Sequence, residues 1–494
     1  MNIYSWLSEH ASIRPHKAAI RFRDTSVGYA ELFSLTGRLS RALRKVGIGR
    51  GDKVTIFLPN MPEFVFSYMA VIASGAVAVL VNPSFTSREL AYILKDSDSK
   101  GIIIEANNVS TYEGIKDQCP LDAVITVGAE GNFSQWISGE ESDYFEDMDR
   151  DDVAAMIYSS GLTGSPMGAM LTQGNLDHNS DLMRVCADCD DTDATLTVIP
   201  CFHSFSASVN MLSMLRYGGT VYLVKNLDFK ELKNILTNGG ITCICAVPTL
   251  FYGLLLHPDV QGVDYTKMKV MIAGGSALSM EIYNGFRERF HADVRQGYGL
   301  TEASPVCAFN TPHVKLKPES IGPTVPGVEA RIVDMQGNVL KPFEKGEILF
   351  KGPNVMKGYY KRPKETAEII IDGWLYTGDL GYMDEDGYIY ITGFKKDMVI
   401  TSGFNVYCKE VENVLNSIPG VKDSAITGIP DLMRGAIIKA FIVTDKPGLE
   451  ENDIKKQARK MLAPYKTPRK VEFVRKIPRD ANGKALIEEI ERIT

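Results

Sequence analysis

The sequence predicts an α/β protein with a large N-terminal domain of stacked, largely parallel sheets with helices plus a small β-barrel, and a smaller α+β C-terminal domain. Three observations predict this class. The chain has 494 residues, enough for two or more well-buried domains. Its first part alternates β-branched runs with helical patterns, as βαβ units do. After Gly393 the order of the elements changes.

The N-terminal part begins its strand–helix alternation at the β-branched run 54–58, which ends at Pro59. A helical pattern from Phe64 to Ser74 follows, and a second strand lies at 77–81. Strand–helix–strand order of this kind implies parallel pairing. Further strands of the same type are expected at 101–104, 195–199, 221–224, 243–247 and 270–273.

The later part of the chain differs in pattern. Between Ile321 and Ile391 it is strand-rich with turn dipeptides, which indicates a small β-barrel or sandwich. Beyond it we expect a helix, a strand, a helix and a strand at 410–418, 440–443, 451–462 and 471–474. This order is typical of a separate α+β domain of about 100 residues. We therefore predict domains at 1–392 and 393–494.

Composition and charge limit the class of function. Apolar residues make up 45% of the chain and charged residues 23%, and the formal net charge is −7. Because nucleic-acid-binding domains usually carry a basic face, this balance argues against a nucleic-acid partner. The longest apolar run, 70–81, is interrupted by Ser74 and Gly75 and is too short to span a bilayer.

The expected location is cytoplasmic. The N-terminal segment has no basic stretch followed by an apolar core, so we expect no signal peptide. The eight cysteines are scattered, which suits a reducing compartment. Cys186 and Cys189 form a CxxC without a second pair at zinc spacing, so we interpret them as plain buried thiols.

Hydroxyl and glycine residues crowd into one short loop, Tyr158-Ser-Ser-Gly-Leu-Thr-Gly-Ser-Pro-Met-Gly168, directly after an apolar run. Glycines let backbone N–H groups turn toward an anion, and hydroxyls add donors. The Gly-Lys-Ser/Thr ending of a Walker A loop is absent. Alone, such a loop is more often a flexible turn than a polyphosphate site. Its candidate phosphate contacts are Ser159, Ser160, Gly161, Thr163 and Gly164.

Four further motifs accompany this loop: Gln296-Gly-Tyr-Gly-Leu-Thr-Glu302, Tyr376-Thr-Gly-Asp379, Ser402-Gly-Phe-Asn-Val-Tyr407 and Pro478-Arg-Asp-Ala-Asn-Gly-Lys484. In this order and spacing, over nearly the whole chain, they resemble the adenylate-forming (ANL) superfamily of acyl-CoA synthetases, luciferases and peptide-synthetase adenylation domains. The resemblance implies an AMP-forming ligase that activates a carboxylic acid, fatty or aryl, with ATP and Mg²⁺. The acyl group would then pass to coenzyme A.

The resemblance also implies which residues hold the nucleotide. Glu302 would bind Mg²⁺ and Thr301 a phosphate, while Tyr298 would stack on adenine. Asp379 would accept from the ribose hydroxyls, which would give this buried carboxylate the partner it needs. The remaining residues implied around the nucleotide are Gly275, Ser276, Gly297 and Gly299. Lys484 would stabilise the charge that develops on the α-phosphate and the acyl carboxylate.

The second step would follow a rotation of the C-terminal domain about a hinge at 393–397, which includes Lys396. The loop Ser402-Gly403-Phe404 would then line a tunnel for pantetheine. His203 matches a position at the junction of that tunnel and the acyl pocket, where it would act as a gate. The implied pocket walls are Ser206, Val247, Gly274 and Gly297.

Three positions depart from the family pattern, and all concern ATP. Met167 stands where a lysine is usual, Leu162 where a threonine is usual, and Phe394 where the hinge usually has an arginine. A hydrogen bond to a charged group is worth roughly 1.5–3 kcal/mol, so losing one would slow adenylation by about 10–150-fold. We therefore expect adenylation to be weakened.

Two alternatives stay open from the sequence. One is a ligase that loads the phosphopantetheine of a carrier protein, because the reacting thiol is the same. The other is an adenylation-impaired or non-catalytic acyl-binding homologue, which Met167 and Phe394 would suit. The sequence also leaves the acid and a homodimer undecided.

Overall fold

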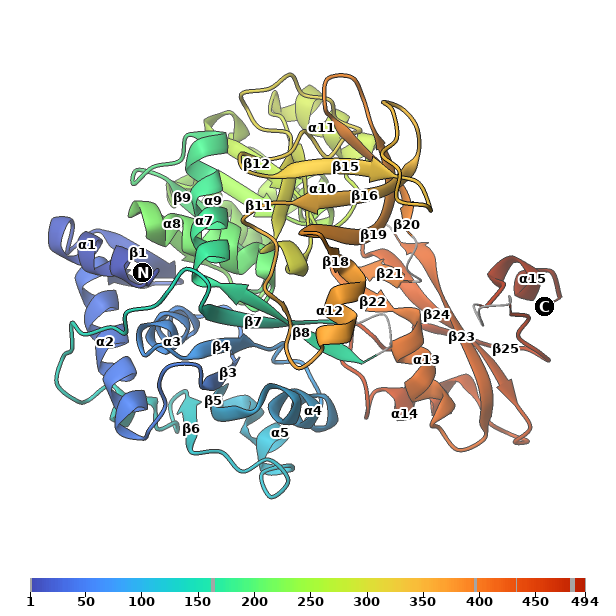
Figure 1. The fold of residues 1–494 in the computed structure, drawn as a ribbon, viewed down its shortest axis with the longest axis horizontal. Helices are drawn as coiled ribbons and strands as arrows, with labels where there is room; N and C mark the ends of the chain where they lie inside the picture. Colours follow the sequence, from blue (N-terminus) through green and yellow to red (C-terminus); the bar gives the residue numbers. More distant parts are fainter. Residues whose placement is uncertain (1, 161–164, 395–397, 432, 480–484, 494) are drawn as a thin grey trace.

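The computed structural model describes residues 2–160, 165–394, 398–431, 433–479 and 485–493. Of Ser160, Phe394, Glu488 and Ile493 it describes the backbone alone. Figure 1 shows a large α/β unit (residues 2–394) and a small unit (residues 398–493) packed against one side of it.

The large unit contains two large, mostly parallel sheets. The first has the strand order β14-β13-β12-β11-β9-β10-β1-β2, and its two edge pairs, β13–β14 and β1–β2, are antiparallel. The bounds are β1 Ala18–Phe22, β2 Thr25–Gly28, β9 Ala194–Thr197, β10 Thr220–Leu223, β11 Cys243–Ala246, β12 Val270–Ala273, β13 Arg295–Gly299 and β14 Val306–Phe309.

The second sheet has the order β17-β8-β7-β4-β3-β5-β6 and is parallel from β7 to β6. The bounds are β3 Lys53–Phe57, β4 Val77–Leu80, β5 Ser99–Glu105, β6 Ala123–Val127, β7 Val153–Ser160, β8 Pro166–Thr172 and β17 Gly358–Tyr359. The parallel pairing that the strand–helix alternation predicted is therefore confirmed in both sheets.

One helix between the two sheets explains their stacking. α3 (Pro62–Ala73) is apolar on all sides, and every residue in it except Glu63 is buried. A helix of that composition belongs inside a core, and a single buried cluster joins α3 to side chains of both sheets. The other helices are α1 Ser5–Ile13, α2 Tyr29–Lys45, α4 Ser87–Ser97, α5 Val109–Glu113, α6 Phe133–Trp136, α7 Gln173–Ala187, α8 Ser213–Tyr217, α9 Phe229–Asn238, α10 Pro248–Leu256, α11 Met280–Phe290 and α12 Pro363–Ile369, with a π-helical segment at Ser206–Leu212.

The region expected to be a small barrel or sandwich is strand-rich, and its described pairings form one five-stranded antiparallel sheet. The strands are β15 Glu329–Val333, β16 Gly346–Lys351, β18 Ile370–Ile371, β19 Trp374–Met383 and β20 Ile389–Phe394. The ten-residue β19 organises the sheet because it pairs with β16, β18 and β20.

The small unit consists of the hairpin β21 Met398–Thr401 and β22 Phe404–Tyr407, the sheet β23-β24-β25, and helices α13 Cys408–Asn416, α14 Glu451–Ala458 and α15 Ile487–Ile493. The sheet strands are β23 Val421–Asp431, β24 Gly435–Thr444 and β25 Lys470–Phe473. α14 ends at Ala458, before the expected Leu462, and the chain continues in turns in which the backbone N–H of Leu462 donates to Ala458 O at 2.9 Å.

The two units have separate sheets. Among the described residues, strands from β21 onward pair only with one another, and a core of their own extends from Val399 to Leu462. The division into 1–392 and 393–494 stays a proposal that this pairing supports. All eight cysteines are free and buried. None of the helices in the described ranges has both the length and the apolar character that a membrane crossing requires.

Candidate active site

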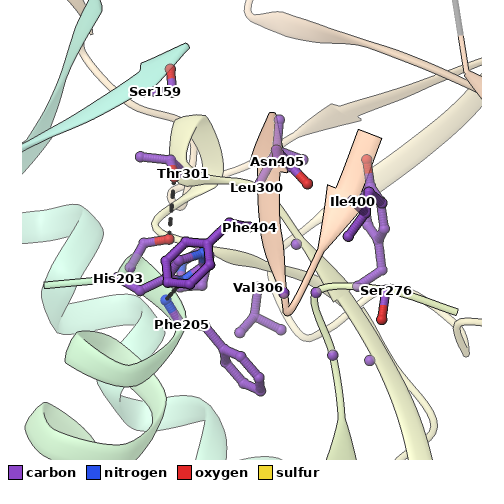
Figure 2. A pocket seen from close by; sticks show the side chains of 18 of the residues that line it. Ser159, His203, Phe205, Ser276, Leu300, Thr301, Val306, Ile400, Phe404 and Asn405 are labelled. Carbon is purple, nitrogen blue, oxygen red and sulfur yellow. Dashed lines mark hydrogen bonds between the residues drawn. The ribbon is translucent and has the colours of Figure 1, made fainter. Parts of the chain in front are cut away.

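A cavity of about 680 Å³ lies where the carboxyl ends of strands in the large unit meet the hairpin β21–β22. Crevices outside the carboxyl ends of strands are the usual ligand sites of α/β sheets. Most of the residues expected from the sequence line this cavity: Ser159, His203, Gly274, Gly275, Ser276, Gly297, Tyr298, Gly299, Thr301, Glu302, Asp379, Gly403 and Phe404. Figure 2 shows the Phe404 ring next to His203, with Thr301 and Ser159 above them and Ile400 apart from them on the other side.

Glu302 is a buried carboxylate on the cavity wall, in a short 3-10 turn after β13. Its Oε1 accepts a hydrogen bond of 2.8 Å from Ser159 Oγ and one of 2.6 Å from the Tyr359 hydroxyl. Burial, followed by the charge of Glu302, raises the pKa of Tyr359, so this hydroxyl stays protonated and donates. The carboxylate therefore joins the end of β7 to β17. Sequence reasoning missed Tyr359.

The surroundings of Glu302 fit a magnesium ion held mostly by its substrate. Mg²⁺ prefers oxygen ligands and is usually bound by one or two carboxylates plus phosphates and water. Ser159 and Thr301 add hydroxyl oxygens at the same wall. In the described part of the chain, no group of three or more His, Cys, Asp or Glu side chains forms a dedicated cage. One carboxylate beside hydroxyls suits an ion that arrives with ATP.

Asp379 on β19 is paired within the protein itself. It is 9% exposed, and its Oδ2 accepts a hydrogen bond from the Tyr298 hydroxyl. Burial first, and then the charge of Asp379, raises the pKa of Tyr298 well above its ordinary value. A tyrosine hydroxyl therefore already gives this buried carboxylate one partner, and the contact with the ribose stays a prediction. The Tyr298 ring lies 5.7 Å from the Phe350 ring at an interplanar angle of 29°.

Glycines keep one wall of the cavity thin. Gly275 follows β12 with φ +79°, a conformation that favours glycine. A Cβ atom on Gly274 would lie 3.1 Å from the Phe205 ring, and one on Gly297 would lie 3.3 Å from Ile272 Cγ2. Side chains at Gly274 and Gly297 would therefore crowd the ring and the strand that border the cavity.

His203 stands in the loop after β9, with its ring at the cavity wall. Its Nδ1 accepts a 3.2 Å hydrogen bond from the backbone N–H of Phe205, which assigns the ring proton to Nε2. Burial lowers the pKa of His203 to about 4, so the ring is neutral near pH 7. The adjacent Ser204 Oγ lies 3.3 Å from Thr301 Oγ1.

Asn60 holds the loop that carries His203. Its Nδ2 donates to the carbonyls of Thr197, Ile199 and Val224 at 3.2, 3.1 and 3.2 Å, and its Oδ1 accepts from Cys201 N at 2.7 Å. This buried side chain thus ties the carboxyl ends of strands in both large sheets to the loop. The only signal in the sequence was its place directly after the Pro59 that ends a strand.

The hairpin of the small unit reaches the large unit next to His203. The Phe404 ring lies 6.3 Å from Phe202 at 13° and 6.4 Å from His203 at 70°. A second, apolar cavity of about 170 Å³ adjoins this contact, and both cavities are lined by His203, Phe205, Gly275, Gly403 and Phe404. Ser402 lines the smaller cavity. A narrow apolar space therefore lies beside His203, on the side of the hairpin.

Two expected pocket residues lie elsewhere. Ser206 is fully buried, donates to Ile199 O at 2.7 Å and lines neither cavity. Val247 lines the smaller cavity and not the larger one. Gly161, Leu162, Thr163, Gly164, Lys396 and Lys484 lie outside the described residues, as does the side chain of Ser160.

The two remaining departures from the family pattern have definite places. Met167 is 4% exposed, pairs with Ser159 in the β7–β8 ladder, packs into the core and lines neither cavity. Phe394 pairs through its backbone with Asp379 in the β19–β20 ladder. The position that would usually carry an arginine is therefore next to the proposed ribose acceptor.

One part of the main cavity is apolar. Its wall is formed by Leu182, Met183, Val209, Ile272, Val306 and Phe309. Among the described lining residues, Lys466 is the only lysine or arginine, and it belongs to the small unit. Nothing in the described apolar wall would compensate the charge of a second carboxylate.

Comparison with known proteins identifies relatives over the whole chain. The family model described as "AMP-binding enzyme" matches residues 7–360, and "AMP-binding enzyme C-terminal domain" matches residues 410–484. The chain is 33% identical to a long-chain-fatty-acid–CoA ligase of Bacillus subtilis, covering 98% of this chain and 93% of that protein. It is 34% identical to a feruloyl-CoA synthase of an Amycolatopsis species, covering 99% and 98%.

Two solved structures are similar to different degrees. An o-succinylbenzoate CoA synthetase (MenE) double mutant from Bacillus subtilis, bound with its product analogue OSB-NCoA, has a TM-score of 0.88 at 28% identity, covering 98% of this chain and 97% of that chain. ATP-bound MatB from Rhodopseudomonas palustris has a TM-score of 0.76 at 30% identity, covering 100% and 99%. The structure is thus closer to the product-analogue complex than to the ATP complex, although the sequence identities are similar.

Proposed function

Because this chain belongs to the AMP-binding enzyme family and is an AMP-forming acid–CoA ligase, we propose that it activates an apolar monocarboxylic acid with ATP and transfers the acyl group to CoA. The observation that carries this proposal is the hairpin contact at His203. There, Gly403 and Phe404 of the small unit border a narrow apolar space that adjoins the main cavity. A pantetheine arm is long and thin and ends in a thiol, which such a space would admit.

We propose that the arrangement of the two units corresponds to the acyl-transfer step. The contacts of the Phe404 ring with Phe202 and His203, beside the smaller cavity, support this. Adenylation would then need residues 393–494 to rotate about 393–397, so that Lys484 reaches the nucleotide. Alternation of this kind is a gating step that can limit turnover.

The chemistry divides into two displacements. First, a carboxylate oxygen of the acid attacks the α-phosphorus of ATP, and the bond to pyrophosphate breaks. Asp379 would accept from the ribose and Thr301 would donate to a phosphate oxygen, while Glu302 would hold Mg²⁺, which offsets the negative charge of both partners. Next, the CoA sulfur attacks the acyl carbonyl carbon, the bond to AMP breaks, and the thiol proton passes to solvent. His203, neutral near pH 7, would border the path of the thiol.

The acid is proposed to be uncharged beyond its reacting carboxylate. The wall formed by Leu182, Met183, Val209, Ile272, Val306 and Phe309 offers dispersion contacts and no described cation. A second carboxylate buried there would lack a partner, which is costly. Alkanoic and unsubstituted aryl acids therefore fit better than dicarboxylic acids.

A panel of acids tests this assignment. Pyrophosphate release and thioester formation are measured with alkanoic, aryl and dicarboxylic acids at equal concentration, with CoA or a phosphopantetheinylated carrier protein as acceptor. We expect turnover with alkanoic or aryl acids, CoA as the better acceptor, and little turnover with dicarboxylic acids. Preference for a dicarboxylic acid would contradict the proposed acid class, and preference for the carrier protein would contradict CoA as the acceptor.

We also propose that adenylation is slow, because Met167 and Phe394 stand where the family usually has cations. Met167 packs in the core and Phe394 pairs with Asp379, so neither position supplies a cation to the nucleotide. We expect the adenylation step to be slower than the transfer step. The two steps are compared by measuring the rate of acyl transfer from synthetic acyl-adenylate and the rate of pyrophosphate release. An acyl-transfer rate no higher than the rate of pyrophosphate release would contradict this.

A further inference from the structure

We infer that Lys466 is a positioning residue for acyl transfer: bound to Glu89 of the large unit, it holds the small unit so that Phe404 stands beside His203. This inference rests on the proposed function, because it assigns Lys466 to the transfer step of that reaction. Lys466 lies outside the five motifs from which the site was predicted.

The contact is a buried ion pair between the two units. Lys466 Nζ lies 3.1 Å from Glu89 Oε1 and 2.6 Å from Glu410 Oε1, and the three side chains are 4%, 12% and 9% exposed. The backbone N–H of Ala463 also points to Glu89 Oε1 at 3.4 Å. Lys466 Nζ lies 4.8 Å from the centre of the Phe85 ring. Because burial removes water from these charges, replacing Lys466 would leave two buried carboxylates without their cation. Replacing Glu89 would leave Lys466 paired with Glu410 but without its carboxylate partner on the large unit.

Glu89 is fixed on the large unit by its place in α4. It is the third residue of that helix, and its Oε2 accepts a hydrogen bond of 2.9 Å from Thr86 N in a capping box. The Thr86 hydroxyl in turn accepts from Glu89 N. One carboxylate oxygen therefore caps the helix, while the other faces the small unit. One turn further along α4, the Tyr92 hydroxyl donates to Pro166 O at 2.7 Å, which anchors the helix to β8.

Lys466 is linked to the site through its neighbour in the chain. The Tyr465 ring stacks on Phe404 with centroids 4.4 Å apart at 26°, and Phe404 stands beside His203. A chain of direct contacts thus leads from Glu89 through Lys466, Tyr465 and Phe404 to His203. If Lys466 loses Glu89, the segment that supports the Phe404 ring loses its anchor on the large unit.

The test separates the two half-reactions in Glu89→Gln and Lys466→Met. Transfer from synthetic acyl-adenylate to CoA should fall by about 10–150-fold, the range for loss of one charged hydrogen bond. Pyrophosphate release should stay near the wild-type rate, which also shows that the variant is folded. Lys466→Arg keeps the charge and should retain most of the transfer rate.

Lys439→Gln is the matched control, because Lys439 pairs with Glu472 at 2.7 Å inside the small unit. It should leave both half-reactions near the wild-type rate. Transfer unchanged in Glu89→Gln, or a loss of both half-reactions in parallel, would overturn the inference.

Hydrogen–deuterium exchange tests the same contact without turnover. Amides of residues 398–407 should exchange faster in Glu89→Gln than in the wild type, while Lys439→Gln should leave them unchanged. Equal exchange in the wild type and Glu89→Gln would overturn the positioning role. A wild type that forms no acyl-adenylate with any acid would contradict the proposed function instead, and the exchange result would still decide the contact.

Discussion

Gly403 of the small unit lies so close to Val247 of the large unit that a Cβ atom on Gly403 would come within 2.5 Å of Val247 Cγ1. Gly403 also has φ +82°, which other residues rarely adopt. The hairpin can therefore approach His203 this closely only because residue 403 has no side chain. Two of the three residues of the loop expected to line a thiol tunnel, Gly403 and Phe404, thus make the interface between the units.

Gly403→Ala should slow acyl transfer by about tenfold or more, because the added methyl group pushes the hairpin away from Val247, while adenylation stays near the wild-type rate. Transfer from synthetic acyl-adenylate to CoA measures this. Gly448→Ala is the control: Gly448 has φ +74° but no atom within 4 Å of an added Cβ. Equal acyl-transfer rates in Gly403→Ala and Gly448→Ala would contradict the role of the contact with Val247, because any loss would then come from backbone strain alone.

Asp379→Asn should raise the KM for ATP by about 10–150-fold, since one charged hydrogen bond to the ribose is lost. The measurement is pyrophosphate release at varied ATP. Asp386→Asn, an exposed position in the turn that follows the same strand, should leave this KM unchanged. An unchanged KM in Asp379→Asn would show that Asp379 serves only as the partner of Tyr298.

His203 should make the fold sensitive to acid. Burial lowers its pKa from 6.5 to about 4, so between these values the unfolded chain binds a proton that the folded chain does not. Stability is therefore lost as pH falls through this window. Between pH 7 and pH 4.5, the melting temperature of His203→Gln should fall by less than that of the wild type. His313→Gln, at an exposed site, should show the same fall as the wild type. An identical decrease in His203→Gln would contradict the lowered pKa.

Asn60→Ala should destabilise the large unit by about 2 kcal/mol or more, because three carbonyls and one N–H lose their partner in a buried place. The loop that carries His203 would loosen, so the KM for the acid should rise as well. Thermal unfolding and the acid KM are compared with Asn338→Ala, whose side chain is exposed. A wild-type melting temperature in Asn60→Ala would contradict this role.

The sequence predicted the strands and the residues that follow them, since short motifs place Ser159, Glu302 and Asp379 at fixed points after or within a strand. It could not predict their partners across the fold. Tyr359 meets Glu302 over 57 positions, and Lys466 meets Glu89 over 377. Such pairs arise from the packing of whole units, which local patterns do not contain.

The direction in which side chains point was the second property that could not be predicted from the sequence. The loop motif marked Met167 as a missing cation, but only the register of β7 and β8 shows that its side chain packs in the core. Likewise Ser206 lies in a π-helical segment, where its hydroxyl turns to Ile199 O and away from both cavities.

The stoichiometry of one complete reaction tests most directly whether the protein is an AMP-forming ligase. The protein is incubated with an apolar monocarboxylic acid, ATP, Mg²⁺ and CoA, and AMP, ADP and acyl-CoA are quantified by mass spectrometry. We expect one AMP for each acyl-CoA, with no ADP. Acyl-CoA formed with ADP, or the absence of both AMP and acyl-CoA across the whole panel of acids, would contradict it.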